Sequence, residues 1–341
     1  MAPPALPGSA FRATVAATVA AGAQVGIEDI RRAAEQLRGI AIPTPVLACP
    51  FPAGGGQVHL KCELLQRTGS FKLRGAFVHL ARLPDAVRRG GVVAASAGNH
   101  AQGVALAAAH FGAPAVVYMP AAAPAVKVAA TEALGARVEL IPGTVTEALA
   151  AAQRHVAERG GVFVHPFDHP DVIAGQGTIG LELLDQLPEV GTVLVPVGGG
   201  GLLAGVASAL RARRPEVRVV GVQAEGAAAF VASFRSGRLA ASSPLATIAD
   251  GIAVERPGTR TLAICRRLVD EVVTVPDTAI WLAMRHCLEQ LGLVVEPAGA
   301  AGLAALWRRG ARAFPQPVAA VVSGGNIDDN LRARLLLETV A

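Results

Sequence analysis

Short segments rich in valine and alanine alternate with helix-like segments along most of this chain, and this alternation constrains the fold most strongly. The pattern of apolar residues along the chain predicts helices at 27–40, 101–111 and 277–291. It also predicts strands at 58–61, 92–95, 115–118, 137–141, 192–197, 218–224, 272–275 and 318–323. Continuous apolar strands are typical of parallel sheets that are covered on both faces. The sequence therefore predicts an α/β protein with open, mostly parallel sheets and helices on both faces.

Length and charge narrow the class of protein. With 341 residues, of which 52% are hydrophobic, the chain is long enough for two lobes with well-buried interiors. The net charge of +5 is spread along the chain, and no basic run with interleaved aromatic residues occurs. We therefore expect no nucleic-acid partner and a small anionic ligand.

No membrane segment is expected. Residues 90–126 carry no Asp, Glu, Lys or Arg, but Asn99, His100, Gln102 and several glycines and prolines divide the stretch into strand, helix and strand. Four isolated cysteines show no metal-site spacing and predict reduced thiols in a cytoplasmic protein. Residues 1–24 are predicted to form a disordered extension, with a targeting peptide as the less favoured alternative.

A lysine at the start of a predicted helix is the first candidate for chemistry. It lies in the string Ser70-Phe71-Lys72-Leu73-Arg74-Gly75-Ala76. The exposed N–H groups and the dipole at a helix amino end disfavour a nearby positive charge, so the neutral, nucleophilic amine of Lys72 is easier to reach. Taken alone, a solvated surface lysine explains the string equally well.

A glycine run follows the predicted strand at 192–197. Gly198, Gly199, Gly200 and Gly201 precede Leu202 and a helix start. Consecutive glycines let backbone N–H groups surround an anion, and the following helix dipole favours negative charge. The Gly-Lys-Ser/Thr of a P-loop is absent, so we expect a phosphate site of another kind, with a plain tight turn as the alternative.

Two further loops follow predicted strands. In the first, Ser96, Ala97, Gly98, Asn99 and His100 open a helix, so their N–H groups can hold a substrate carboxylate while the Asn99 amide reaches a cofactor oxygen. Ordinary helix capping is the alternative, and His100 is equally compatible with a buried polar residue. The second loop, Ser323-Gly324-Gly325-Asn326, ends the last predicted strand.

These four strings, in their order along the chain (70–76, 96–100, 198–202 and 323–326), resemble the fold-type II pyridoxal-phosphate enzymes, and within them the serine and threonine dehydratases related to serine racemase. The resemblance runs from about residue 27 to residue 327. It implies a larger cofactor-binding domain of residues 25–87 plus 168–341 and a smaller mobile domain of residues 88–167. It also implies a homodimer or a higher homo-oligomer.

The resemblance further implies roles for the candidate residues. Lys72 holds pyridoxal 5'-phosphate covalently and removes the α-proton of the substrate, next to Phe71. The glycines and Leu202 bind the phosphate, Asn99 contacts the phenol oxygen, and Ser323 contacts the ring nitrogen. Residues 96–100 bind the amino-acid substrate. A neutral hydroxyl at the ring nitrogen stabilises a carbanion less than a carboxylate does, which favours prompt loss of a β-substituent.

The resemblance implies β-elimination of water from L-threonine or L-serine, followed by hydrolysis of the released enamine to 2-oxobutanoate or pyruvate and ammonia. Racemase relatives place a serine where this chain has Ala97, and alanine cannot carry a proton, so we expect little racemisation. A hydroxyaspartate dehydratase stays open as an alternative. A β-replacement enzyme of the cysteine synthase type and a non-catalytic sensor are less favoured.

No metal site is predicted. His165, Asp168, His169 and Asp171 lie close together, but Pro166 and Pro170 favour a crossover loop. Racemase relatives hold a divalent cation with a glutamate, a backbone carbonyl and an aspartate. Glu225 and Ala229 match the first two, and Val231 stands where the aspartate would be. A salt-bridged Glu225 or a weak cation site completed by water are the open alternatives.

Overall fold

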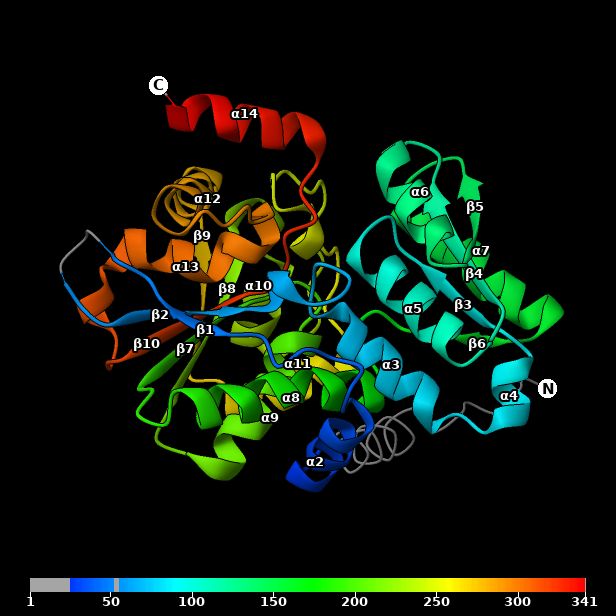
Figure 1. Ribbon diagram of the computed structural model, residues 1–341, viewed down its shortest axis with the longest axis horizontal. Coiled ribbons are helices and arrows are strands. Elements are labelled where there is room, and N and C mark those ends of the chain that lie inside the picture. Colours follow the sequence, from blue (N-terminus) through cyan, green and yellow to red (C-terminus); the bar gives the residue numbers. More distant parts are fainter. Residues whose placement is uncertain (1–24, 52–54, 341) are drawn as a thin grey trace, which may run out of the picture.

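The computed structural model describes residues 25–51 and 55–340 and contains two separate β-sheets, each covered by helices (Figure 1). The predicted extension at residues 1–24 lies outside the described residues. Among the described helices, none is both long enough and apolar enough to cross a membrane.

The larger sheet has six strands in the order β1-β2-β10-β7-β8-β9. β1 pairs antiparallel with β2, and the remaining pairs are parallel. The strands are β1 (Val46–Ala48), β2 (Val58–Cys62), β7 (Thr192–Pro196), β8 (Arg218–Ala224), β9 (Glu271–Val275) and β10 (Val318–Val322). Since β10 lies between β2 and β7, the carboxyl ends of these three strands meet at one edge of the sheet.

The smaller sheet has four parallel strands in the order β5-β4-β3-β6. They are β3 (Val92–Ala95), β4 (Ala115–Pro120), β5 (Arg137–Ile141) and β6 (Val162–Phe163). All four come from one continuous part of the chain, whereas the larger sheet combines strands from both sides of it. The domain limits of 88 and 167 stay a prediction.

Helices lie on both faces of the larger sheet, with α12 and α13 on one side and α8, α9 and α11 on the other (Figure 1). The described α-helices are α2 (Ile27–Gln36), α3 (Lys72–Arg82), α4 (Asp85–Arg89), α5 (Asn99–His110), α6 (Ala125–Ala133), α7 (Val145–Arg159), α8 (Pro170–Gln186), α9 (Gly201–Arg213), α10 (Ala229–Ser236), α11 (Thr259–Leu268), α12 (Asp277–Leu291), α13 (Pro297–Arg309) and α14 (Asp329–Val340).

Strand β7 illustrates why the sheet needs both helical layers. Val193 and Val195 pack into one hydrophobic cluster with residues of α8 and α9. Leu194, which points the opposite way, packs into a second cluster with residues of α12 and α13. Successive side chains of a strand alternate between the two faces. A strand that is apolar at every position is therefore buried on both sides, as the sequence predicts.

The predicted fold class is confirmed, and every predicted strand has a counterpart in the structure. The helix predicted at 27–40 ends earlier, at Gln36. Gly39 has a φ of 74°, a left-handed conformation that cannot continue a right-handed helix. The short strands β1 and β6 were not predicted, because two or three residues give no periodic pattern.

Candidate active site

Lys72 is the first residue of α3, immediately after Phe71. A short helical turn and the segment 66–71 connect the end of β2 to this helix. The Lys72 Nζ donates a hydrogen bond to the carbonyl oxygen of Pro166 at 3.1 Å and lies 5.2 Å from the centroid of the Phe71 ring. The amine therefore points to the crossover between the two sheets rather than into bulk solvent.

The environment of Lys72 makes its neutral form accessible. Burial lowers the pKa of Lys72 from 10.5 to about 8, and the nearby Glu296 carboxyl opposes this shift. An amine with this pKa is neutral in roughly a tenth of molecules at pH 7, compared with roughly one in several thousand at its ordinary pKa. A neutral amine can act as a nucleophile and as a base.

The glycine run connects β7 to α9, as predicted, and its geometry excludes larger residues. Gly200 has a φ of 98°, which L side chains rarely adopt. A Cβ atom at Gly200 would lie 2.4 Å from the Phe230 ring, and one at Gly199 would lie 2.4 Å from the Phe167 ring. The Leu202 side chain is buried in the core, so only its backbone can contribute to a ligand site.

The Ser323 loop lies directly against the Lys72 loop. The Phe71 N–H donates to the carbonyl oxygen of Ser323 at 3.1 Å, and Ser70 forms an antiparallel bridge with Gly324. This proximity follows from the parallel pairing of β2 with β10, whose carboxyl ends lie side by side. Two strings separated by 250 residues in the sequence are thereby joined at one edge of the sheet.

Asn99 connects the smaller sheet to the same edge. Its amide nitrogen donates to Glu296 Oε1, and its amide oxygen accepts from Asn326, both at 2.7 Å. Asn99 keeps one amide N–H for a further acceptor, because an amide nitrogen carries two. The structure thus brings together Lys72, Asn99 and the Ser323 loop, which the sequence predicted as one site.

The loop that precedes Asn99 leaves space on its outer side. The N–H of Gly98 donates to the Ser96 hydroxyl at 3.2 Å, and nothing lies within 4 Å of the position that a Cβ would occupy at Gly98. The first N–H groups of α5 have no partner within the helix. The first N–H groups of α5 therefore offer donors next to open space, as a carboxylate site requires, whereas the Ser96 N–H already donates to the carbonyl oxygen of Tyr118 at 3.1 Å.

His100 has a different environment from its neighbours. The side chain is buried, and its Nε2 lies 2.9 Å from the carbonyl oxygen of Val164. Burial, followed by the charge of Lys72, lowers the pKa of His100 to about 3, so the ring is neutral. These contacts match a buried polar residue, which the sequence left open. Substrate binding by His100 stays a prediction without a contact to support it.

Glu296 was not predicted from the sequence, although it contacts the predicted site residue Asn99. Its side chain is buried and accepts a hydrogen bond from Asn99. Burial, followed by the charge of Asp250, raises the pKa of Glu296 to about 7. A signal was present, because Glu296 is the only charged residue between Glu289 and Arg308. A lone acid in such an apolar stretch is rarely buried without a role.

Replacing Glu296 by glutamine should change the pH dependence of stability. The carboxyl ionises near 4.5 in the unfolded chain and near 7 in the folded one. The wild type should therefore lose about 3 kcal/mol of folding free energy as pH rises from 4.5 to 7. Relative to the wild type, we expect Glu296→Gln to be more stable by only about 1 kcal/mol at pH 5 and by about 3 kcal/mol at pH 8, measured by urea unfolding.

A matched control is Glu289→Gln, which removes the carboxylate of an exposed residue paired with Arg285. As a surface substitution, it should change stability by less than about 0.5 kcal/mol at either pH. If Glu296→Gln also gave the same offset at pH 5 and pH 8, the raised pKa of Glu296 would be wrong.

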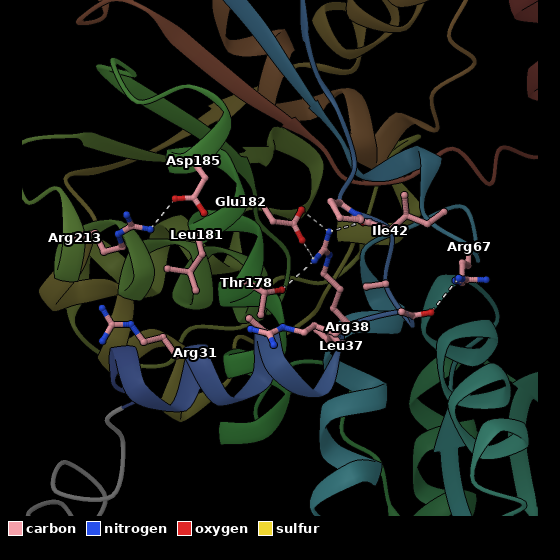
Figure 2. A pocket seen from close by; sticks show the side chains of 15 residues that line it. Arg31, Leu37, Arg38, Ile42, Arg67, Thr178, Leu181, Glu182, Asp185 and Arg213 are labelled. Carbon is pink, nitrogen blue, oxygen red and sulfur yellow. Dashed lines mark hydrogen bonds and ion pairs between the residues drawn. The ribbon is translucent and has the colours of Figure 1, made fainter.

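A buried ionic network anchors α3 behind the site. Arg74 donates to both carboxylate oxygens of Glu63 at 2.8 Å and to Glu182 Oε1 at 2.6 Å. Lys61 Nζ also contacts Glu182, at 2.7 Å. Glu182 and Thr178 both belong to α8 and lie side by side in Figure 2, and each accepts a hydrogen bond from the Arg74 guanidinium. The network ties the lysine helix to β2 and α8.

Next to this ionic network, the protein surface has a pocket of about 590 Å³ between α2, α8 and α9 (Figure 2). None of the predicted site residues lines it. The candidate active site is therefore defined by the converging loops and not by this pocket.

Two stretches were considered for metals in the sequence, residues 165–171 and the region of Glu225, and both contain residues bonded to other protein groups. His165 Nδ1 accepts hydrogen bonds from the N–H groups of Phe167 and Asp168, at 3.2 and 2.8 Å. Glu225 pairs with Arg308, which matches the salt-bridged alternative.

Thr261 is a further residue that the sequence did not predict. Its hydroxyl donates to the carbonyl oxygen of Gly199 at 2.6 Å and thereby holds the glycine run in place.

Known proteins resemble the chain over most of its length. A family model described as pyridoxal-phosphate dependent enzyme matches residues 37–324. The L-threonine ammonia-lyase of Thermotoga maritima is 47% identical over 314 residues, which cover 92% of this chain and 78% of that protein.

Two further relatives have other activities in their names. The L-threo-3-hydroxyaspartate ammonia-lyase of a Pseudomonas species is 44% identical over 311 residues, covering 90% of this chain and 97% of that protein. The solved structure of maize serine racemase superposes with a TM-score of 0.85 at 36% identity, covering 93% of this chain and 98% of that one.

Proposed function

Since the chain belongs to the pyridoxal-phosphate-dependent enzymes, we propose that it is an ammonia-lyase that converts L-threonine to 2-oxobutanoate and ammonia, or L-serine to pyruvate and ammonia. The observation that carries this proposal is the convergence of the half-buried Lys72 amine with Asn99 and the Ser323 loop at the carboxyl end of the larger sheet.

The residues present fit the cofactor. A Cβ at Gly199 or Gly200 would collide with an aromatic ring, so the run keeps its backbone N–H groups free of side chains and suited to a phosphate. Ser323 is a buried residue whose hydroxyl forms no hydrogen bond within residues 25–51 and 55–340, which supports a role toward a ring nitrogen. The free N–H of Asn99 supports a contact with a phenol oxygen.

When bound, pyridoxal phosphate supplies an aldehyde that captures amines and a ring that makes the α-proton of an amino acid acidic. We assign to Lys72 both the covalent attachment of the cofactor and the removal of the α-proton. The lowered pKa of Lys72, about 8, supports the second role, because a base works best when its pKa lies near the operating pH. The first N–H groups of α5, next to the loop of residues 96–98, orient the substrate by its carboxylate.

Lyase activity should exceed racemisation. A racemase needs a second acid or base on the opposite face of the α-carbon, and the position that carries a serine in racemase relatives is Ala97 here. The neutral hydroxyl of Ser323 further favours prompt elimination of a β-hydroxyl. L-threo-3-hydroxyaspartate is the second candidate substrate, supported by the similarity to the Pseudomonas lyase.

We further propose that residues 88–167 form a smaller mobile domain that closes on the larger domain of residues 25–87 plus 168–341. The ion pair of Lys127 with Asp250, at 3.1 Å, supports a contact between these two parts. The enzyme is proposed to be a cytoplasmic homodimer or higher homo-oligomer, in line with its buried, unpaired cysteines.

The test is a steady-state panel of β-hydroxy amino acids in both enantiomers, with products identified by mass spectrometry. We expect L-threonine to give 2-oxobutanoate and ammonia with a higher kcat/KM than 3-hydroxyaspartate, and D-threonine to give almost none. Inverted amino acid as the main product, or turnover only of O-acetylserine with sulfide, would contradict the proposal.

A further inference from the structure

Three potential metal ligands meet behind the lysine helix. His79 lies two turns after Lys72 on α3, while His169 caps the amino end of α8 and Asp171 lies in its first turn. The sequence shows only the pair on α8, because His79 is 92 residues away from Asp171. Within residues 25–51 and 55–340, this is the one group of three such side chains whose donor atoms converge, all within 4.8 Å of one another.

We propose that His79, His169 and Asp171 bind a divalent transition-metal ion of the zinc class. The donor separations fit this ion. The Asp171 Oδ2 lies 3.2 Å from His79 Nδ1 and 3.5 Å from His169 Nδ1. Ligands at 2.0–2.1 Å in a tetrahedron around zinc are separated by about 3.3 Å. A single ion can therefore contact these atoms with small side-chain movements.

The chemistry of the donors also favours zinc. Two imidazole nitrogens and one carboxylate oxygen suit zinc better than calcium or magnesium, which prefer oxygen ligands. His79 is buried, while the side chains of His169 and Asp171 are 34% and 19% exposed. The fourth position is therefore open to a water molecule from the solvent side. None of the four cysteines belongs to this group of converging donors.

Arg82 orients the Asp171 carboxylate, and it also competes with the ion for the negative charge of that carboxylate. Its guanidinium donates to Asp171 Oδ1 at 2.7 Å, which fixes the carboxylate and leaves Oδ2 facing the two rings. Ligating carboxylates commonly have such a partner on the second oxygen. The ion must replace two contacts, which are the Asp171 bond to His79 and the bond from the Asp171 N–H to His169 Nδ1, both at 3.2 Å. Both lie at the long end of the hydrogen-bond range, so little is lost.

A bound ion would connect two elements that position the active site. α3 carries Lys72 at its amino end, and α8 begins directly after the crossover that contains Pro166, the partner of the Lys72 amine. Cross-linking these helices restricts the movement of the crossover. The expected consequence is a higher thermal unfolding midpoint for the metal-loaded enzyme.

The test uses cofactor-loaded enzyme, freed of metals by chelation and dialysed against micromolar zinc in a phosphate-free buffer. We expect one zinc per chain by elemental analysis. His79→Gln and Asp171→Asn should each weaken binding at least tenfold, while the control His110→Gln, at the exposed end of α5, should bind as the wild type does. Unchanged binding in His79→Gln and Asp171→Asn, or no zinc in the wild type, would overturn the proposal.

A second measurement needs no variant and covers the case in which substitutions disturb folding. Cobalt(II) added to the wild-type enzyme should give the intense visible absorption of a tetrahedral site and should be displaced by one equivalent of zinc. A weak spectrum typical of six-coordinate cobalt, or no displacement, would refute a site of this geometry.

Discussion

Replacing Lys72 by alanine should abolish ammonia release from every β-hydroxy amino acid, with kcat falling by more than about 10³-fold. The variant removes the only half-buried amine at the converging loops, and with it both the proposed covalent anchor and the proposed base. Steady-state assays of keto acid measure the loss of turnover. Borohydride reduction followed by peptide mass spectrometry measures the loss of the covalent anchor, because only an enzyme with Lys72 should yield a pyridoxyl adduct on residues 70–76.

Lys72→Arg is the matched control for charge and size. The guanidinium keeps the positive charge at the start of α3 but does not lose its proton near neutral pH. It should therefore be as inactive as Lys72→Ala while retaining the folded structure. Substantial turnover by either variant, or an adduct on a different lysine of the wild type, would show that Lys72 is not the reactive amine.

The lowered pKa of Lys72 also predicts how fast the cofactor-free protein captures pyridoxal phosphate. Only the neutral amine attacks an aldehyde, and its fraction rises about tenfold per pH unit below the pKa. With a pKa of about 8, the capture rate should rise between pH 6 and 8 and then level off. Burial is the main cause, so a rate that kept rising up to pH 10 would indicate a solvated lysine.

Much of this site could be predicted because its parts are local. The loops after β3, β7 and β10 each follow a strand with four or more apolar residues, and carboxyl ends of parallel strands collect ligands. The sequence therefore predicts Lys72, Asn99, the glycine run and Ser323 as one site. In the structure, the Ser323 loop bonds to Phe71, the neighbour of Lys72, at 3.1 Å and to Asn99 at 2.7 Å.

The residues that were missed act through contacts between distant segments. Glu296 contacts Asn99 from 197 positions away, and Arg74 contacts Glu182 from 108 positions away. Helix and strand periodicity report which face of an element is buried, but not which charged group on another element faces it. Arg74 even belongs to the string that identified Lys72, and its burial could not be predicted, because arginine is usually exposed.

Replacing Arg74 by methionine should destabilise the protein by about 3–5 kcal/mol, since a buried ion pair that loses one partner leaves an uncompensated charge. Glu63 has no exposed surface. Burial opposes its ionisation, yet the Arg74 guanidinium keeps the pKa of Glu63 below its ordinary value. Without Arg74, Glu63 keeps only the hydroxyl bond from Thr44 and the charge of nearby Lys61. Urea unfolding at pH 7 should show the loss as a lower midpoint.

Two further variants separate charge burial from packing. Arg38, like Arg74, lines the pocket between α2, α8 and α9 (Figure 2). It is exposed and has no ion-pair partner within the described residues, so Arg38→Ala should change stability by less than about 0.5 kcal/mol. The double variant Arg74→Met, Glu63→Leu removes both charges, while Lys61 still pairs with Glu182. Because two apolar side chains can replace a buried pair at little cost, it should recover most of the loss. If the double variant were as unstable as Arg74→Met alone, lost packing of the arginine stem, and not the stranded Glu63 carboxylate, would be the cause.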